Sequence, residues 1–232
     1  MKAVYASTVN HADPLAALAV GEQPEPQARP FWSTVSVRAV TVNHHDVWSL
    51  QGVGLAAEQT PMILGTDAVG ILDEDIPGKH GLKAGSEVVL YTFVGTDGAG
   101  VAPGERRTIL SEKYPGTMAE KTSVPSANVF AKPASLTTAE AAALGTSWLT
   151  AYSLLFDAAG IKPGDSVLIQ GAGGGVSTAA IQLAHAAGLE VFVTSRDADK
   201  RSKALKLGAN AAPEAFAKMI AGDVFGKIVI EL

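Results

Sequence analysis

The sequence predicts an α/β protein in two parts, a β-rich part over residues 1–135 and a second part over residues 136–213. Two observations predict this division. Short apolar segments separated by glycine and proline turns fill the first part, which is typical of a small barrel or sandwich. In the second part, a glycine cluster follows a short apolar strand and precedes a helical pattern, which is typical of a βαβ unit.

The first part alternates between predicted strands and turns. Strands are expected over residues 2–7, 15–20, 34–42, 63–72, 87–94 and 118–124. In the third of these, Val35, Val37 and Ala39 share one face, and Val40 and Val42 continue the pattern after a shift of one residue. That shift of phase predicts a β-bulge.

The second part begins with helical signals. Thr137 precedes Glu140 by three residues, which is the spacing of a capping box, so a helix is expected to begin there. A second helix is expected over residues 150–159. A strand, a helix that ends at Gly188 and a further strand then make the βαβ unit, over residues 167–170, 176–187 and 190–194.

The turn between the first strand and helix of this unit is rich in glycine. Side chains there would keep a diphosphate away from the backbone N–H groups at the start of the helix. The strict G-x-G-x-x-G spacing is replaced by A-x-G-x-x-S at Ala172, Gly174 and Ser177. A tight turn without a ligand is the alternative, but the βαβ context favours dinucleotide binding. The predicted diphosphate site is Gly171, Ala172, Gly173, Gly174, Gly175 and Val176.

The end of the second βαβ strand carries residues that suit a phosphate. A site that prefers NAD would have Asp or Glu there for the ribose hydroxyls. This chain has Ser195 and Arg196, followed by Lys200. A hydroxyl and a guanidinium suit a 2′-phosphate better than a ribose diol, so NADPH is predicted over NADH. The alternative is a solvated basic start of the next helix.

Composition excludes several classes of function. The 18 Lys and Arg residues stand against 23 Asp and Glu residues, a net charge of −5, which argues against nucleic acid and anionic membranes as partners. The absence of cysteine excludes disulfides and thiolate chemistry. Because no apolar run approaches a membrane span and no signal pattern precedes the first strand, a cytoplasmic protein is expected.

With these elements in place, the chain resembles the medium-chain dehydrogenase/reductase superfamily, in particular its zinc-independent quinone-oxidoreductase-like branch. The resemblance implies a GroES-like β-barrel catalytic domain over residues 1–135 and a Rossmann-type nucleotide-binding domain over residues 136–213. The segments that carry it are VNHHDVWSLQG at 42–52, ILGTDAVG at 63–70, AEAAAL at 139–144, LTAY at 149–152, PGDSVLIQGAGGGV at 163–176 and LGA at 207–209.

The resemblance also bears on metal binding. Zinc-type members have Cys at the position of Asn43, His at that of Thr66 and usually Cys near Thr146, so no zinc site is expected. His44 and His45 are adjacent, and on a strand they would point to opposite faces. We expect them to line a pocket or to make structural hydrogen bonds.

The family mechanism without metal is hydride transfer from NADPH to a quinone, an activated alkene or a related carbonyl compound. Asn43 is the candidate donor of a hydrogen bond to the substrate oxygen, and Asp46 would orient its neighbours or cap a turn. Thr150 resembles the family threonine near the nicotinamide. Trp48 is expected in the core rather than stacked on a substrate.

The resemblance breaks near residues 210–214. The segment 214–232 is similar to the family's C-terminal helix and strand, which return to the catalytic domain, so the chain is expected to carry an internal deletion and a truncated Rossmann domain with an exposed sheet edge. A homodimer is implied by the family, although its usual edge falls in the missing part. An inactive remnant that binds nucleotide or a protein partner is therefore the alternative to an active oxidoreductase.

Overall fold

The computed structural model describes residues 1–78, 81–95, 107–211 and 228–229, and these form two compact units, Met1–Thr146 and Ser147–Leu232. The boundary lies eleven residues beyond the expected one. Helix α2 (Thr138–Ala142) belongs to the first unit because its alanines pack with Val69 in an apolar cluster of that unit. Each unit is described by itself.

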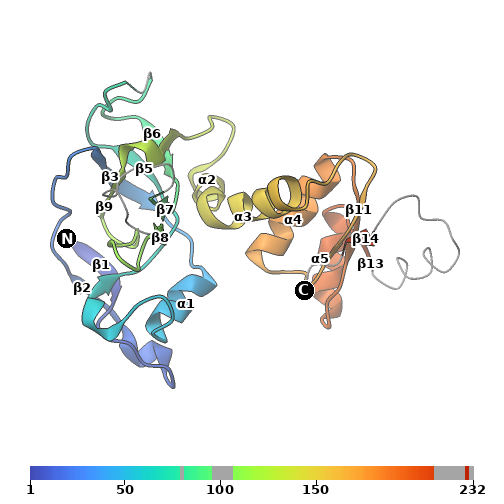
Figure 1. The fold of residues 1–232 in the computed structure, drawn as a ribbon, viewed down its shortest axis with the longest axis horizontal. Coiled ribbons are helices and arrows are strands. Elements are labelled where there is room, and N and C mark those ends of the chain that lie inside the picture. Colours follow the sequence, from blue (N-terminus) through green and yellow to red (C-terminus); the bar gives the residue numbers. More distant parts are fainter. Residues whose placement is uncertain (79–80, 96–106, 212–227, 230–232) are drawn as a thin grey trace, which may run out of the picture. The chain divides into compact units, whose positions relative to one another are not determined.

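The first unit is built from antiparallel strands, as predicted (Figure 1). Its largest sheet has the order β10-β6-β5-β3-β9. These strands span Val129–Ala131, Glu87–Leu90, Val69–Leu72, Trp32–Ala39 and Lys121–Pro125. A second sheet has the order β2-β1-β4, with strands Leu18–Glu22, Lys2–Ala6 and Met62–Ile63, and a third pairs β7 (Phe93–Val94) with β8 (Thr108–Ile109).

The predicted bulge is confirmed, because the β3–β5 register shifts between Val37 and Ala39. Other segments differ from prediction, and one of them, residues 87–94, divides into β6 and β7, which belong to different sheets. Residues 15–20 divide into a 3-10 turn, η1 (Pro14–Ala17), and β2, and residues 63–72 divide into β4 and β5 around a turn at Gly65. The chain at 44–50 is helix α1 (His44–Leu50) instead of a strand. Short 3-10 turns also occur at Ala57–Gln59 and Ser126–Asn128.

The second unit holds a parallel sheet of four described strands in the order β13-β12-β11-β14. They span Asn210–Ala211, Glu190–Val193, Ser166–Ile169 and Ile228–Val229. Helix α4 (Gly175–Ala186) packs on β11 and β12, and α3 (Leu149–Tyr152) packs on α4 (Figure 1). Helix α5 (Ala198–Lys206) precedes β13, and π turns flank α3 at Leu144–Trp148 and Ser153–Ala158.

This strand order corresponds to the first four of the six strand positions of a Rossmann-type sheet, 3-2-1-4, with β11 as strand 1. The fold class predicted from the sequence is therefore confirmed. The C-terminal pairing differs from expectation, because the described part of segment 214–232, Ile228–Val229, runs parallel to β11. Strand β11 thus has a neighbour on each side, in place of the exposed edge expected there. The expected deletion near 210–214 falls mostly outside the described residues, which resume only at 228.

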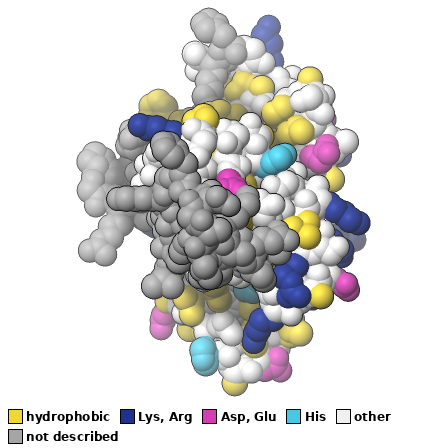
Figure 2. Space-filling view, turned by 90° about the vertical axis from the view of Figure 1, so that its right-hand side faces the viewer, with side chains coloured by type: hydrophobic (Ala, Val, Ile, Leu, Met, Phe, Trp, Pro, Cys, Tyr) yellow, Lys and Arg dark blue, Asp and Glu magenta, His cyan; other side chains and the backbone are white. Residues whose placement is uncertain are grey.

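The surface of the protein carries side chains of both charges. Figure 2 shows Lys and Arg side chains interspersed with Asp, Glu and hydrophobic ones on the face it draws. Among the described residues, no helix has the length and apolar character needed to cross a bilayer.

Candidate active site and nucleotide site

Asp46 connects the start of helix α1 to the turn that follows β4. Its Oδ2 accepts the backbone N–H of Asn43 at 2.7 Å, and its Oδ1 accepts the backbone N–H of Gly65 at 3.0 Å. The side chain is buried, and this burial raises the pKa of Asp46 while the two backbone hydrogen bonds oppose the rise. Of the two roles predicted for Asp46, the structure shows the capping role, at the start of helix α1. The same carboxylate also holds the turn at Gly65 through the backbone N–H of that residue.

Asp67 is the second buried carboxylate, with 0% of its surface exposed. Its Oδ2 accepts hydrogen bonds from the Thr41 hydroxyl and, at 2.8 Å, from Nδ2 of Asn43. Burial raises the pKa of Asp67, and the neighbouring Thr146, Thr41 and Asn43 groups oppose that rise. Asp67 follows Gly65 and Thr66 in the same turn, so the cap made by Asp46 also determines where Asp67 lies.

Hydrogen bonds continue from Asn43 to two further threonines. Nδ2 of Asn43 lies 3.1 Å from Oγ1 of Thr41 and 3.1 Å from Oγ1 of Thr66, and the Thr66 and Thr146 hydroxyls are 3.0 Å apart. Together with Asp67, three acceptors surround an amide nitrogen that has two hydrogens. The predicted donation from Asn43 to a substrate would therefore compete with these contacts. The Thr146 hydroxyl also interacts with the Asp67 carboxylate, where it opposes the rise of the Asp67 pKa, so Asp67 touches both ends of this row.

The three positions where zinc-type relatives would have ligands do meet in space. Asn43, Thr66 and Thr146 form one continuous hydrogen-bonded row. Their donor set is an amide and two hydroxyls, which does not match the thiolate, imidazole and carboxylate ligands that zinc takes. In the part of the chain that the structure describes, no group of three His, Cys, Asp or Glu side chains is placed to hold a metal ion.

The adjacent histidines lie on helix α1, which corrects the strand geometry expected for them. Nε2 of His45 is 3.2 Å from Oε1 of Glu112, and Nδ1 is 3.4 Å from the Ser111 hydroxyl, so His45 makes structural hydrogen bonds. His44 is exposed and contacts the Trp48 ring with centroids 6.1 Å apart. Trp48 is 49% exposed, so its predicted place in the core is wrong.

In the second unit, the glycine turn has the backbone shape that glycine favours. Gly171 and Gly173 have φ values of 75° and 107°, and Gly174 is the N-cap of α4. The turn is closed by the Ser177 hydroxyl, which lies 3.0 Å from the carbonyl of Gly171 and 3.2 Å from the N–H of Gly174. Ala172 is buried, and its N–H bonds to the carbonyl of Thr194 at 2.9 Å.

The N–H groups at the start of α4 have no partners among the described residues. Those of Gly173, Gly175, Val176 and Ser177 make no hydrogen bond there. A Cβ atom on Gly175 would lie 2.7 Å from the Ser147 hydroxyl, so a larger residue would have to displace that side chain. Four free donors at a helix N-terminus, kept accessible by glycines, are suited to bind a diphosphate.

The predicted phosphate residues lie on the loop after β12 and at the start of α5. Lys200 crosses the glycine turn, because a Cβ atom on Gly173 would lie 2.9 Å from its Cδ. Ser195 is half-buried and its hydroxyl accepts the N–H of Asp197 at 3.2 Å, while Arg196 is exposed. Asp197 caps α5 through the N–H of Lys200 at 3.1 Å, which orients the lysine. The structure therefore brings Lys200 to the predicted diphosphate site.

Thr150 lies on α3 of the second unit, with its side chain exposed. Ser147, three residues earlier, is the residue of this helical segment that reaches the glycine turn. Sequence reasoning missed Ser147, Thr41 and Asp67. For Asp67 a signal was present, since an acidic residue inside the apolar run at 63–72 is rarely buried without a specific reason.

Comparison with known proteins matches both units to one family. Residues 29–134 match the alcohol dehydrogenase GroES-like domain. Crotonyl-CoA reductase of Streptomyces avermitilis is 30% identical over 224 residues, which cover 86% of this chain and 50% of the relative. The crystal structure of an NAD-dependent alcohol dehydrogenase is 36% identical with a TM-score of 0.80, covering 91% of this chain and 62% of that one.

A third likeness is to the quinone oxidoreductase of Thermus thermophilus, solved also in complex with NADPH. It is 29% identical with a TM-score of 0.67, covering 91% of this chain and 59% of that one. The chain spans 34% of the length of the synaptic vesicle membrane protein VAT-1 homolog of Rattus norvegicus, another relative, and 50% of that of the Streptomyces avermitilis reductase.

Proposed function

The chain belongs to the medium-chain dehydrogenase/reductase superfamily, and on that premise we propose that it is an NADPH-dependent oxidoreductase. It transfers hydride to a quinone, an activated alkene or a related carbonyl compound, without zinc. The observation that carries this proposal is the glycine turn at the carboxyl end of β11, with four unbonded N–H groups at the start of α4. Ligands of open α/β sheets bind at this end of the strands.

The dinucleotide would be held by backbone first and by side chains second. The N–H groups of Gly173, Gly175, Val176 and Ser177, which have no partner among the described residues, would bind the diphosphate at the start of α4, where the helix dipole favours negative charge. Lys200, whose stem lies over Gly173, adds a full positive charge beside them. These features fit any dinucleotide of this class.

The preference for NADPH rests on the loop after β12. Ser195 and Arg196 replace the acidic residue that would accept the ribose hydroxyls of NADH. The Arg201 side chain donates a hydrogen bond to the carbonyl of Ser195, which holds the backbone of this loop in place. The Arg196 guanidinium makes no ion pair with a described residue. A guanidinium left available in this way suits a 2′-phosphate.

When bound, NADPH would supply the hydride, and the first unit supplies the polar groups for the substrate. An oxygen that gains negative charge during reduction is stabilised by a preorganised donor. The row Asn43–Thr66–Thr146, held by the Asp67 carboxylate, supplies amide and hydroxyl groups that could turn to such an oxygen. The reductase and quinone oxidoreductase named among the relatives support a conjugated substrate.

A thermal-shift titration tests the cofactor. At a concentration of 100 times Kd, a ligand that binds only the folded state adds about 2.7 kcal/mol of stability. We expect a clear shift with NADPH and a smaller one with NADH. Arg196→Gln should reduce the NADPH shift and leave the NADH shift unchanged. Lys162→Gln, an exposed basic residue before the opposite end of β11, is the matched control.

Turnover then distinguishes the oxidoreductase from an inactive remnant. NADPH oxidation at 340 nm, followed with 1,4-benzoquinone as the acceptor, should proceed and stop when the quinone is left out. NADPH binding without turnover on quinone or enone acceptors would favour the remnant. A protein that shows no shift with either nucleotide would contradict the oxidoreductase and the nucleotide-binding remnant, and would leave only a remnant that binds a protein partner.

A further inference from the structure

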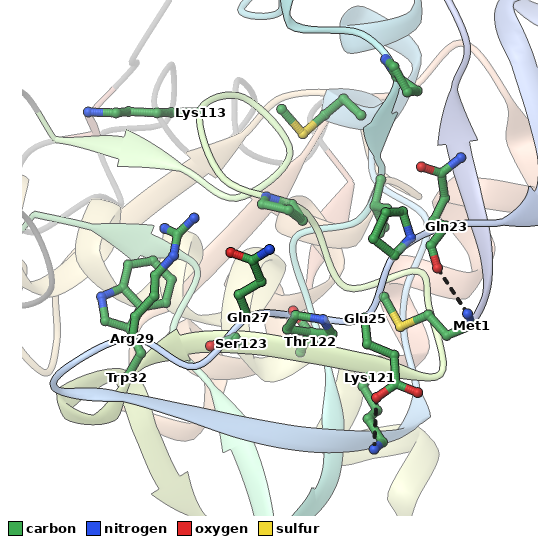
Figure 3. Close-up of a pocket in the computed structure, with 16 residues that line it drawn as sticks. Met1, Gln23, Glu25, Gln27, Arg29, Trp32, Lys113, Lys121, Thr122 and Ser123 are labelled. Carbon is green, nitrogen blue, oxygen red and sulfur yellow. Dashed lines mark hydrogen bonds and ion pairs between the residues drawn. The ribbon is translucent and has the colours of Figure 1, made fainter.

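A cavity of about 460 Å³ lies in the first unit, beside the proline-rich segment 23–30. Figure 3 shows its walls, to which the N-terminus, this segment and strand β9 contribute. Its size falls within the range of small-molecule sites, roughly 300–1,000 Å³. None of the residues assigned above to the nucleotide or to the Asn43 row lines it.

Apolar groups of restricted mobility form much of the wall. Four of the lining residues are prolines, whose rings hold the backbone at one φ value: Pro24, Pro26, Pro61 and Pro115. Met62 and Ile63 on β4 add buried aliphatic surface. Such a wall suits a flat apolar body, because little side-chain freedom is lost when it is covered.

At one end of the cavity the charged groups pair with one another. There, the Glu25 carboxylate pairs with Lys121 at 3.3 Å, and the N-terminal ammonium lies 2.9 Å from the Glu22 carboxylate and 2.9 Å from the Gln23 carbonyl. Figure 3 places Met1, Glu25 and Lys121 at this end and Arg29 with Trp32 at the other.

Arg29 and Lys113 are the cations of the other end, where the Lys113 ammonium lies 5.6 Å from the centre of the Tyr114 ring and Arg29 supplies the guanidinium. The guanidinium carbon of Arg29 lies 5.1 Å from the centre of the Trp32 ring and 5.3 Å from that of Tyr114. Within the described part of the chain, this guanidinium makes no hydrogen bond and no ion pair. Stacking on two rings orients the planar fork in advance, so less freedom is lost when it binds a carboxylate through two parallel hydrogen bonds.

We propose that this cavity binds a small organic monocarboxylate with a planar apolar body. The carboxylate pairs with Arg29 beside the Trp32 and Tyr114 rings, and the apolar body lies along the proline and β4 wall. A single available guanidinium matches one carboxylate, since at the other end the charges already pair with one another. This site is separate from the nucleotide turn, which lies in the second unit, and it does not depend on the proposed oxidoreductase activity.

Isothermal titration of the full chain with 2-naphthoate tests the proposal, with neutral 2-naphthalenemethanol as the matched ligand. We expect naphthoate to bind with a Kd on the order of 0.1–1 mM, and the alcohol to bind at least tenfold more weakly. Arg29→Gln should weaken naphthoate at least tenfold, and Arg29→Lys should give an intermediate value. Arg38→Gln, an exposed arginine of β3 outside the cavity, should change nothing.

Three results would overturn the proposal. They are the absence of naphthoate binding to the wild-type chain, equal affinities for naphthoate and the alcohol, and an unchanged affinity in Arg29→Gln. Displacement of naphthoate by saturating NADPH would also overturn it, because the probe would then occupy the nucleotide site. Circular dichroism of each variant shows that the fold is retained, and Arg29→Lys keeps the test decisive if Arg29→Gln unfolds.

Discussion

The amide of Asn43 donates to Oδ2 of Asp67 at 2.8 Å, and this contact joins a residue at the start of helix α1 to a fully buried carboxylate in the turn before β5. The same amide nitrogen reaches Thr66, whose hydroxyl is in contact with Thr146. A buried carboxylate thus anchors a row of donors that ends at a half-buried hydroxyl. The arrangement holds these polar side chains of the first unit in one hydrogen-bonded set.

Removal of the Asn43 amide should lower the free energy of unfolding. In Asn43→Ala, the buried Asp67 carboxylate loses one of its two donors on Oδ2, which typically costs about 1–3 kcal/mol of unfolding free energy. Urea denaturation measures this loss. Asn10→Ala, which removes a cap of an exposed turn, is the control and should cost less. Equal losses in the two variants would contradict the role given to Asn43.

Asp67 should give the protein a distinctive pH dependence. Burial raises the pKa of Asp67 above its ordinary value of 3.8, so the folded protein holds this proton more tightly than the unfolded chain does. Asp67 therefore contributes its full stabilisation of the folded state below pH 3.8. This contribution is lost as the pH rises through the pKa that Asp67 has in the folded protein. The stability of the wild type relative to Asp67→Asn should therefore fall as the pH rises from 3.8.

Urea denaturation between about pH 2.5 and 8 checks this slope, and Glu140→Gln should show a pH dependence of the opposite sign. The hydrogen bonds from Thr137 lower the pKa of Glu140, so its contribution is present above its ordinary pKa and is lost as the pH falls. The wild type relative to Glu140→Gln should thus lose stability in acid. A pH-independent difference for Asp67→Asn would contradict the raised pKa.

Local signals in the sequence predicted the elements that depend on neighbouring residues. The capping box of Thr137 and Glu140 is present, with the Thr137 N–H 2.9 Å from the Glu140 carboxylate. The glycine turn and its helix lie where the βαβ pattern placed them. Helix α1 was missed although Asn43 and Asp46 have the spacing of a cap, because the adjacent histidines were interpreted as strand residues.

The Asn43 row could not be predicted in full, because its members are distant in sequence. Thr41 and Asp67 are 26 residues apart, and Thr66 and Thr146 are 80 apart. The spacing of apolar residues along the chain does not predict these contacts. They depend on the β3–β5 pairing and on the π turn that holds Thr146. The resemblance indicated Asn43, Thr66 and Thr146 as one site, but nothing local assigned Asp67 to it.

The nucleotide turn can be tested by adding one methyl group. In Gly173→Ala, the Cβ atom would lie 2.9 Å from Cδ of Lys200, at a φ of 107°. Gly164→Ala is matched to it, since its φ is 92° but no atom lies within 4 Å of the new Cβ. Both variants should lose about 1–2 kcal/mol from backbone strain. Only Gly173→Ala should lose the thermal shift with NADPH, and a retained shift would contradict the assignment of this turn.

Gly145 should tolerate no side chain, because it brings the π turn into contact with Asp67. A Cβ atom on Gly145 would lie 2.6 Å from the carbonyl oxygen of Leu90 and 2.9 Å from Oδ1 of Asp67. The first neighbour is backbone and the second is a buried carboxylate, so neither can move easily. We expect Gly145→Ala to lose about 1–3 kcal/mol, as overpacking typically does, and to separate Thr146 from Thr66. Gly21→Ala on β2 is the control, since its Cβ would have only ordinary contacts with Tyr5. A Gly145→Ala protein with the melting temperature and turnover of the wild type would show that the Thr66–Thr146 contact does not depend on this close approach.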